Sequence, residues 1–389
     1  MSIYLIALTS FILFLSTQVG IPALPALAAQ LDANTQAVAA ILSAALMTLV
    51  LLQFFSGMLA DRYGRRLVLI CGAFLGGISS LLCALVGHWQ WLLVLRILGG
   101  IADAIAMPAL LGLTAEVAAG QHGSSFGILR SSQGLSFIAA PVIGGQLSRW
   151  GLCVPFVVDG LLSLLICAVL TMTMQDHKQP YYTGHSVEQW RQLKSLFTAK
   201  SVYAFFLFGM ANNFAFPILS SFVPAKGQLL GLTPSQLSVL LASEAIAYTL
   251  GSYLAGKLSD RLGRRFFVII AQPLILLACM GLTWSHSGPG LAIFYAIFGL
   301  GASMTYLMSS VMMADITPKD QCATVLGAFD AAIDLVLFIA PSLALAFYGF
   351  LGSMELLLLS AGIPALIAWP IAWRVQETRP SAAIIWGEG

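Results

Sequence analysis

The stretch Gly57-Met-Leu-Ala-Asp61-Arg-Tyr-Gly64-Arg65-Arg66 decides the fold, because it returns 199 residues later as Gly256-Lys-Leu-Ser-Asp260-Arg-Leu-Gly263-Arg264-Arg265. A repeat at so long an interval indicates that a whole structural unit has been duplicated. The sequence therefore predicts two similar halves, residues 1–174 and 201–389, the second ending in a short tail. The same offset, to within one residue, pairs Gly100 with Gly299, Glu116 with Asp315, Gly127 with Gly327 and Pro141 with Pro341.

The composition places both halves in a membrane. Of the 389 residues, 59% are hydrophobic and 9% are charged, and the mean hydropathy is +0.91. Such values exclude a soluble enzyme, a nucleic-acid-binding protein and a disordered scaffold. The net charge of +2 gives no reason to expect an anionic partner.

The apolar stretches have the length and continuity of transmembrane helices. A helix needs roughly 20 apolar residues to cross a hydrocarbon core of about 30 Å, whereas the strands of a β-barrel would alternate apolar and polar residues. We therefore expect an all-α polytopic membrane protein with two pseudo-symmetric bundles of six helices. The expected spans are 3–27, 36–58, 67–87, 90–114, 124–147, 152–174, 202–223, 234–257, 266–285, 289–313, 322–347 and 353–374.

Basic residues flank the expected spans unevenly. Of the 18 Lys and Arg residues, 14 fall on the side of the two termini, Arg149 and Lys226 fall on the opposite side, and Arg96 and Arg130 lie within spans. Loops rich in Lys and Arg remain in the cytoplasm. We therefore expect a multi-pass protein of a bacterial inner membrane with both termini cytoplasmic, its first span being retained rather than cleaved as a signal.

One connection between spans is long enough to carry structure of its own. Within residues 175–200, Val187, Trp190, Leu193 and Phe197 recur at helical spacing. This spacing is typical of an amphipathic helix that lies at a membrane interface. We expect the segment to be a cytoplasmic linker between the two bundles.

The repeated stretch resembles the signature of the major facilitator superfamily, which occupies the loops after the second and eighth spans. The resemblance implies that Asp61 caps or pairs with the eleventh helix in one state of an alternating-access cycle. It also implies that Arg65 and Arg66 reach Glu116 at the end of the fourth helix. The counterpart gating residues of the second copy are Gly256, Asp260, Arg264 and Asp315.

The glycines of the first copy have a physical reading of their own. Gly57 allows the second helix to approach a neighbour closely, and Gly64 supports the tight turn that follows. The simpler alternative is that the arginines only fix the orientation of the chain. That alternative would not require the aspartate and the glycines to occur twice.

Further stretches are similar to drug/proton antiporters with twelve helices. Leu93-x-x-Arg96-x-x-Gly99-Gly100 resembles a motif of proton-coupled members, and Ile21-Pro22-Ala23-Leu24-Pro25 resembles their first helix. Gly127-x8-Ser136-x3-Ala140-Pro141-x2-Gly144-Gly145 resembles the antiporter motif, with Ser136 and Ala140 in place of two glycines. Many such exporters carry an acid where this chain has Gln18, so any transported proton must be carried by another carboxylate.

Acidic residues near the middle of the expected spans are candidate proton carriers. An ionisable group at the centre of a bilayer costs about 2.5–3.5 kcal/mol on insertion scales, so each one suggests a function. Asp330 and Asp334 are one helical turn apart, so the two carboxylates are not expected to be ionised together and one of them is a candidate proton carrier. Alternatively, Arg130 or Arg96 neutralises one of them in a structural ion pair. In a third alternative, one acid is permanently protonated and serves only in packing. Asp103 is either a proton carrier or the partner of Arg96. The candidates are Asp103, Glu244, Asp330 and Asp334.

Other polar and aromatic residues lie on helices that the fold assigns to the substrate cavity. Aromatic rings could stack on a planar or cationic substrate, although a single ring is more often part of the packing than a ligand contact. One of the two adjacent asparagines is expected to bond the backbone, and Asp159 is expected to make a structural hydrogen bond. The cavity candidates are Gln18, Arg96, Arg130, Asn212, Asn213, Tyr248 and Tyr306.

Together these patterns predict a secondary active transporter. The favoured hypothesis is proton-coupled export of a small amphipathic molecule or drug by a monomer that works by alternating access. The alternative is an exporter of a specific metabolite, lipid or siderophore, which could be anionic and bound by Arg96 and Arg130. We expect no cofactor, metal site, nucleic-acid partner or enzymatic activity, because the five histidines and six cysteines lack ligand or nucleophile spacing.

Overall fold

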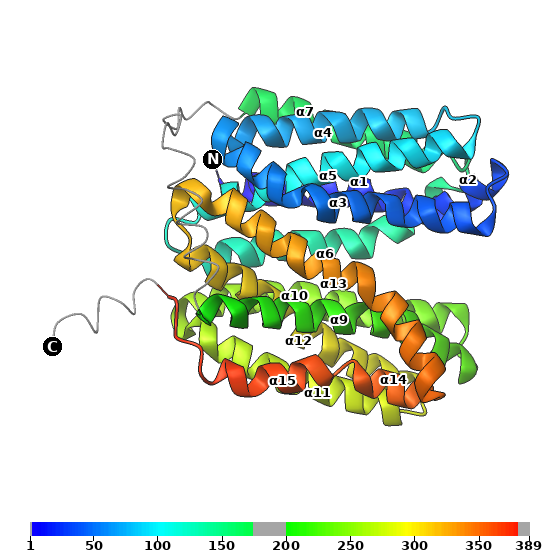
Figure 1. The fold of residues 1–389 in the computed structure, drawn as a ribbon. Coiled ribbons are helices and arrows are strands. Elements are labelled where there is room, and N and C mark those ends of the chain that lie inside the picture. Colours follow the sequence, from blue (N-terminus) through cyan, green and yellow to red (C-terminus); the bar gives the residue numbers. More distant parts are fainter. Residues whose placement is uncertain (1, 174–199, 380–389) are drawn as a thin grey trace. The chain divides into compact units, whose positions relative to one another are not determined.

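The computed structural model describes residues 2–173 and 200–379, and all regular elements in these residues are helices (Figure 1). Within the same residues, twelve helical stretches are long and apolar enough to cross a membrane. The predicted all-α polytopic fold is thereby confirmed. The elements are α1 (Ile3–Val19), η1 (Ile21–Ala23), α2 (Leu24–Gln30), α3 (Thr35–Tyr63), α4 (Arg65–Cys83), α5 (Trp89–Val117), α6 (His122–Leu147), α7 (Val154–Thr173), α9 (Lys200–Leu229), α10 (Pro234–Leu262), α11 (Arg264–Trp284), α12 (Gly288–Ile316), η2 (Lys319–Gln321), α13 (Cys322–Leu351), α14 (Met354–Ser360) and α15 (Ile363–Ala372).

The first and last spans are interrupted, although the sequence predicts each as a single helix. The first span consists of α1, the 3-10 helix η1 and α2, and Pro22 and Pro25 lie at the breaks. The last span consists of α14 and α15, which Ala361 and Gly362 separate, and Pro364 lies in the first turn of α15. Proline has no backbone N–H and its ring clashes with the preceding turn, so it kinks or ends a helix.

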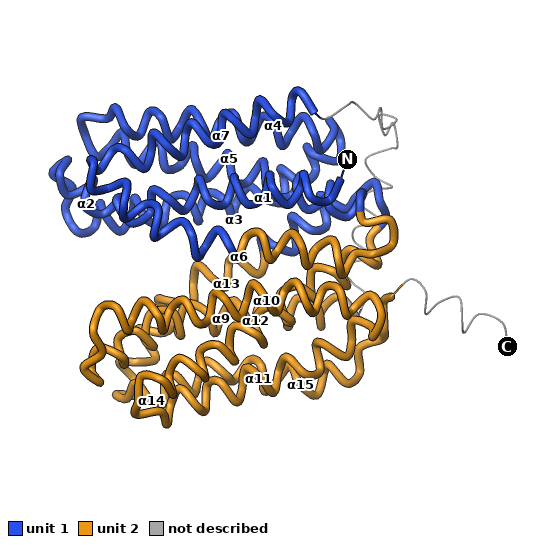
Figure 2. The backbone as a smooth tube through the Cα atoms, turned by 180° about the vertical axis from the view of Figure 1, so that it is seen from behind, with its two compact units in different colours: residues 1–117, 135–183, 318–331 blue, residues 118–134, 184–317, 332–389 orange. Residues whose placement is uncertain are grey.

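The chain forms two compact units (Figure 2). Unit 1 comprises residues 1–117, 135–183 and 318–331, and unit 2 comprises residues 118–134, 184–317 and 332–389. Two helices contribute to both units: α6 gives residues 122–134 to unit 2 and the remainder to unit 1, and α13 is divided after Ala331. The bundle bounds expected from the repeat stay a prediction, and the expected linker helix lies outside the described residues.

Each copy of the repeated stretch forms a tight turn between two helices. Gly64 separates α3 from α4 with a φ of 102°, and Gly263 separates α10 from α11 with a φ of 93°. Side chains disfavour positive φ, so glycine is suited to both positions. The turns place the arginine that follows each glycine in the first turn of the next helix.

A second pair of repeated glycines packs helices within the units. In unit 1, a Cβ atom on Gly100 of α5 would lie 2.5 Å from the carbonyl oxygen of Ala45 on α3. In unit 2, a Cβ atom on Gly299 of α12 would lie 2.4 Å from the carbonyl oxygen of Glu244 on α10. Helices in a membrane associate through such close packing of small residues. The two units use equivalent helix pairs for it, α3 with α5 and α10 with α12.

Candidate functional site

The first copy of the repeated stretch forms a charge network inside unit 1, centred on Arg65. The side chain of Arg65 is 5% exposed and lies 2.8 Å from Asp61 through Nη2. Its Nη1 donates to the carbonyl oxygen of Gly112 at 3.0 Å and to Oε2 of Glu116 at 3.3 Å. A buried guanidinium needs such a set of acceptors, because an unpaired charge is costly away from water.

Asp61 also caps the start of α13. Its Oδ2 accepts hydrogen bonds from the backbone N–H and the hydroxyl of Thr324, both at 2.7 Å, and its Oδ1 accepts from the N–H of Ala323 at 3.2 Å. The N-terminus of a helix attracts negative charge through its free N–H groups and its dipole. A Cβ atom on Gly57 would lie 2.4 Å from the carbonyl oxygen of Ala323, so this approach requires glycine.

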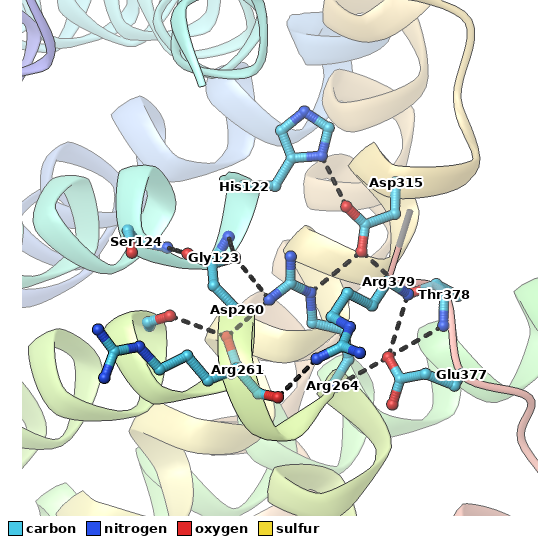
Figure 3. A network of polar contacts seen from close by, with 12 residues as sticks. His122, Gly123, Ser124, Asp260, Arg261, Arg264, Asp315, Glu377, Thr378 and Arg379 are labelled. Carbon is cyan, nitrogen blue, oxygen red and sulfur yellow. Dashed lines mark hydrogen bonds and ion pairs between the residues drawn. The ribbon is translucent and has the colours of Figure 1, made fainter. Parts of the chain in front are cut away.

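The second copy forms the equivalent network inside unit 2 (Figure 3). Asp260 caps the start of α6, where it accepts from the N–H groups of Gly123 at 3.0 Å and Ser124 at 2.7 Å. Arg264 is fully buried and pairs with Asp260 at 2.8 Å and with Asp315 at 3.1 Å. The two copies therefore use the same chemistry, in which an aspartate caps a helix and an arginine joins that aspartate to an acid on another helix.

Unit 2 adds partners that the sequence analysis missed. Nδ1 of His122 lies 2.6 Å from Asp315, and the hydroxyl of Thr378 donates to the same carboxylate at 3.0 Å. Glu377 accepts from the backbone N–H groups of Arg264 at 2.9 Å and Arg265 at 3.1 Å (Figure 3). The only signal in the sequence is a short polar run after the last span, which is not distinguishable from a solvated tail.

The arginines of the first copy differ in their partners. Arg65 contacts Glu116, whereas Arg66 donates to the carbonyl oxygen of Thr171 at 3.0 Å. Of the two implied contacts with Glu116, the structure describes that of Arg65.

The glycines of the expected antiporter motif have different surroundings. A Cβ atom on Gly127 would lie 2.8 Å from Cα of Gly256, within unit 2. In unit 1, a Cβ atom on Gly144 would lie 2.1 Å from the carbonyl oxygen of Val19, whereas one on Gly145 would have nothing within 4 Å. Pro141 lies inside α6. Gly127 and Gly144 are thus required by close backbone contacts, and Gly145 is not.

A cavity inside unit 1, here called the inner pocket, contains three charged residues. It has about 520 Å³ of empty space, including open solvent at its mouth. Arg96 and Asp103 reach it from α5 and Asp159 reaches it from α7, while α1 and α4 contribute smaller residues. The charges of Asp103 and Arg96 both act on Asp159. The pocket thus combines two acids and one base in a part of the chain that is expected to lie in the membrane.

The two acids of the inner pocket differ in their hydrogen bonds. Asp159, which is 5% exposed, accepts a hydrogen bond from Ser80 and has the hydroxyl of Ser163 at 3.4 Å. Asp103 and Arg96 make no hydrogen bond to any residue that the structure describes, and Nε of Arg96 is buried. The expected structural hydrogen bond of Asp159 is present, but the sequence did not place this residue beside Asp103.

Arg130 lies in a polar and aromatic surrounding within unit 2. Its guanidinium carbon is 4.2 Å from the centroid of the Tyr306 ring, which is a cation–π distance. It donates to Gln133 at 3.1 Å and to the hydroxyl of Ser310 at 3.2 Å. These contacts hold a buried positive charge, 4% exposed, against an aromatic face.

The asparagines of α9 bond α13 within unit 2. Nδ2 of Asn213 donates to the carbonyl oxygen of Ile333 at 2.9 Å and to Asp334 at 3.2 Å, and Asn212 donates to Asn213 at 3.3 Å. Asp330 is buried in the part of α13 that belongs to unit 1. A shared proton between Asp330 and Asp334 stays a prediction.

The remaining candidates lie apart from these groups. Glu244 on α10 is 9% exposed, and its carboxylate makes no hydrogen bond to a described residue. Tyr248, one turn further, packs against the apolar core of unit 2, and Gln18 is half-buried in α1. Among the residues that the structure describes, no three His, Cys, Asp or Glu side chains are grouped so that they could hold a metal ion.

Comparison with known proteins identifies the family. The Major Facilitator Superfamily model matches residues 6–229 and, a second time, residues 212–385. The chain belongs to the major facilitator superfamily. It is therefore a secondary transporter rather than an enzyme, as the repeated stretch led us to expect.

Relatives within the major facilitator superfamily are distant in sequence. An uncharacterized MFS-type transporter of Methanocaldococcus jannaschii is 24% identical over 360 residues, which are 91% of this chain and 92% of that protein. The quinolone resistance protein NorA of Staphylococcus aureus is 26% identical over 183 residues, 47% of each protein. The chain thus matches about half the length of NorA.

Solved structures of the superfamily share the fold. The human organic anion transporter MFSD10 (TETRAN) has a TM-score of 0.80 and 15% identity, and the match covers 95% of this chain and 98% of that one. The proton:xylose symporter XylE has a TM-score of 0.79 and 16% identity, with 97% and 96% covered. At these identities the likeness shows the fold alone.

Proposed function

We propose that this transporter exports a small amphipathic molecule in exchange for protons, by alternating access across a bacterial inner membrane, with both of its termini in the cytoplasm. The inner pocket of unit 1 carries the proposal. Charges inside a membrane cost about 2.5–3.5 kcal/mol each on insertion scales. The cost of placing Arg96, Asp103 and Asp159 in one pocket supports a role for their charges in transport. A proton is the smallest ligand that changes the sum of these charges.

Charge balance gives this pocket two states. With both carboxylates ionised, the three side chains sum to one negative charge, and with one proton bound they sum to zero. Because the surroundings have a low dielectric constant, the two states differ strongly in their interaction with a charged or polar neighbour. Binding and release of one proton can thus favour one conformation of the transporter over the other.

The two charge networks supply contacts that alternating access would break and remake. Asp61 and Asp260 each hold the first turn of a helix through backbone N–H groups. Hydrogen bonds to an ionised group contribute roughly 1.5–3 kcal/mol. We propose that the charge networks act as latches that stabilise one state of the transport cycle. We propose that the inner pocket couples proton movement to substrate transport.

The test is proton flux in everted membrane vesicles with an acid interior. A pH-sensitive dye records the gradient while ethidium, chloramphenicol, norfloxacin or fluorescein is added, so that organic cations, neutral compounds, a quinolone and anions are each represented. Proton antiport predicts that at least one compound collapses the gradient in vesicles with the wild-type chain and not in vesicles without it. A gradient that no compound disturbs would contradict the proposal.

A second function is favoured by one observation. Arg130 holds a buried positive charge against the ring of Tyr306 in unit 2, which is a suitable environment for an anionic group of a specific metabolite, lipid or siderophore. In this case Arg130→Ala should weaken transport of the anionic probe at least tenfold and leave the neutral probe nearly unaffected. Arg149→Ala, at the end of α6 and outside this surrounding, is the matched control. Equal losses for anionic and neutral probes would exclude this function.

A further inference from the structure

We infer that Asp103 carries the exchangeable proton of the inner pocket, and that Asp159 is the fixed anion that sets when this proton is bound. The inference rests on the proposed proton coupling and identifies the groups that perform it. The two carboxylates come from α5 and α7 of the same unit, so the site is complete within unit 1. Neither residue is part of the charge networks.

The first argument is the difference in hydrogen bonding. Ser80 donates to one oxygen of Asp159, and the Ser163 hydroxyl faces the other at 3.4 Å. Donors around a carboxylate stabilise its charged form. The hydroxyl oxygen of Ser163 lies 3.0 Å from that of Ser16. The hydroxyl groups of Ser16 and Ser163 thus form a chain that fixes the orientation of Asp159.

Asp103 lacks such support. No residue that the structure describes donates to its carboxylate, although it lines the same pocket. Asp103 is partly buried. An ionised carboxylate without protein donors is costly in a surrounding of low polarity, and this cost falls when the group takes up a proton. Protonation therefore lowers the free energy of Asp103 more than that of Asp159.

Arg96 explains why one proton is sufficient. It lies seven residues before Asp103 on α5, which places both on one face of the helix. Its charge acts on both acids, yet it forms no ion pair with either, and its Nε atom has no partner among the described residues. Arg96 thus compensates one of two negative charges, and the proton compensates the other.

The shape of the pocket indicates the route of the proton. On α4 the lining begins at Gly72 and reaches Cys83, the last residue of the helix, whereas the charge network lies at the first residue, Arg65. Asp159 is near the start of α7, at the same end of unit 1 as Cys83. The pocket therefore extends away from the charge network. In the orientation that the basic residues predict, this end is the outer one, from which an antiported proton would enter.

The wall formed by α4 leaves room for water beside the two acids. Gly72, Gly76, Ser79 and Ser80 face the pocket with small side chains. Polar cavities of this kind hold water that links buried polar groups. The titratable groups that line the pocket from α4, α5 and α7 are Cys83, Arg96, Asp103 and Asp159, and no residue of α3 lines it.

The test uses purified full-length protein in proteoliposomes with ethidium as the probe. Asp103→Asn is expected to abolish the acceleration of ethidium transport by a pH gradient, while downhill movement of ethidium stays measurable. Asp103→Glu should restore part of the acceleration. Asp159→Asn should keep the acceleration, because the exchangeable proton is carried by Asp103. Asp32→Asn, an exposed residue between α2 and α3, is the matched control.

A second readout does not depend on the probe. Infrared difference spectra of the reconstituted protein, recorded while the pH is lowered, should show the band of a newly protonated carboxyl group. All other acids are common to these proteins, so we expect the carboxyl band to be weaker in Asp103→Asn protein than in wild-type protein and unchanged in Asp159→Asn protein. Identical bands in wild-type and Asp103→Asn protein, or a weaker band only in Asp159→Asn protein, overturn the assignment. If the band behaves as expected but no probe is driven by a pH gradient, the proposed function fails and the proton site stands.

Discussion

The carboxylate of Glu377 accepts a hydrogen bond from the backbone N–H of Arg264 at 2.9 Å, so the chain that follows α15 caps the first turn of α11. Its other oxygen accepts from the N–H of Arg265 at 3.1 Å. The free N–H groups of a helix start require such acceptors. Gly263, the residue before α11, has no side chain to act as a cap, so Glu377, which is 113 positions after Arg264, supplies one.

Loss of this cap is expected to lower stability. Glu377→Ala should decrease the free energy of unfolding by about 1 kcal/mol, the usual effect of removing a helix cap. Glu377→Gln should have a smaller effect, because the amide oxygen can still accept one hydrogen bond. The measurement is the midpoint of thermal unfolding in detergent, with the exposed Gln376→Ala as control. Equal midpoints for Glu377→Ala and Gln376→Ala would refute the capping role.

Adjacent glycines of α6 provide a matched pair. A Cβ atom on Gly144 would lie 2.1 Å from the carbonyl oxygen of Val19, whereas one on Gly145 would meet nothing within 4 Å. Gly144→Ala should therefore destabilise the protein by roughly 1–3 kcal/mol, the range for overpacking. Gly145→Ala should be neutral or slightly stabilising, because alanine favours a helix. Yield of monodisperse protein and the thermal midpoint measure both effects, and similar losses for the two variants would contradict the geometry.

The aspartates that cap α6 and α13 are expected to be needed for transport. Asp61→Asn and Asp260→Asn each weaken charge-assisted bonds to helix N–H groups and to a buried arginine. Each bond is worth roughly 1.5–3 kcal/mol, so we expect transport to fall at least tenfold. Thr324→Val, which removes only the hydroxyl donor of Asp61, should have an intermediate effect. Transport rates corrected for the amount of protein in the membrane test this order, and wild-type rates in Asp61→Asn would exclude the latch.

Lys226 should stabilise the end of α11. Its ammonium group is buried and donates to the carbonyl oxygens of Leu282 at 2.8 Å and Thr283 at 2.6 Å, where the last turn of the helix has unpaired acceptors. Lys226→Met keeps the length of the side chain but leaves these acceptors without their donor, at a cost of about 1–3 kcal/mol. Lys257→Met, at an exposed position of α10, is the control. Unchanged thermal stability of Lys226→Met would show that water replaces the ammonium group.

The sequence predicted those features that a local pattern determines. Hydropathy is sufficient to find the twelve spans, since a continuous apolar stretch in a membrane must be helical. The repeat predicted which residues form the charge networks, because Asp61 and Asp260 recur with the same neighbours. Hydropathy does not show the helix breaks near Pro22 and Pro364, and proline alone does not signal a break, because Pro141 lies inside the continuous helix α6.

Contacts between distant segments were not predictable in this way. Asp159 has an unremarkable position in an apolar stretch, and only the packing of α7 against α4 brings it to Ser80. Glu377 resembles any charged residue in a polar tail until the fold places it beside Arg264. Spacing along one helix predicted that Arg96 and Asp103 share a face, but it could not show which other helix faces them.

The inner pocket is lined by residues of unit 1 alone, and this confinement has an evolutionary consequence. The proposed coupling would then depend on residues of one unit only, so residues that bind the substrate elsewhere in the chain can change during evolution without altering it. Related transporters with different substrates could then share the same proton-coupling residues, and a change of substrate would rarely alter the coupling.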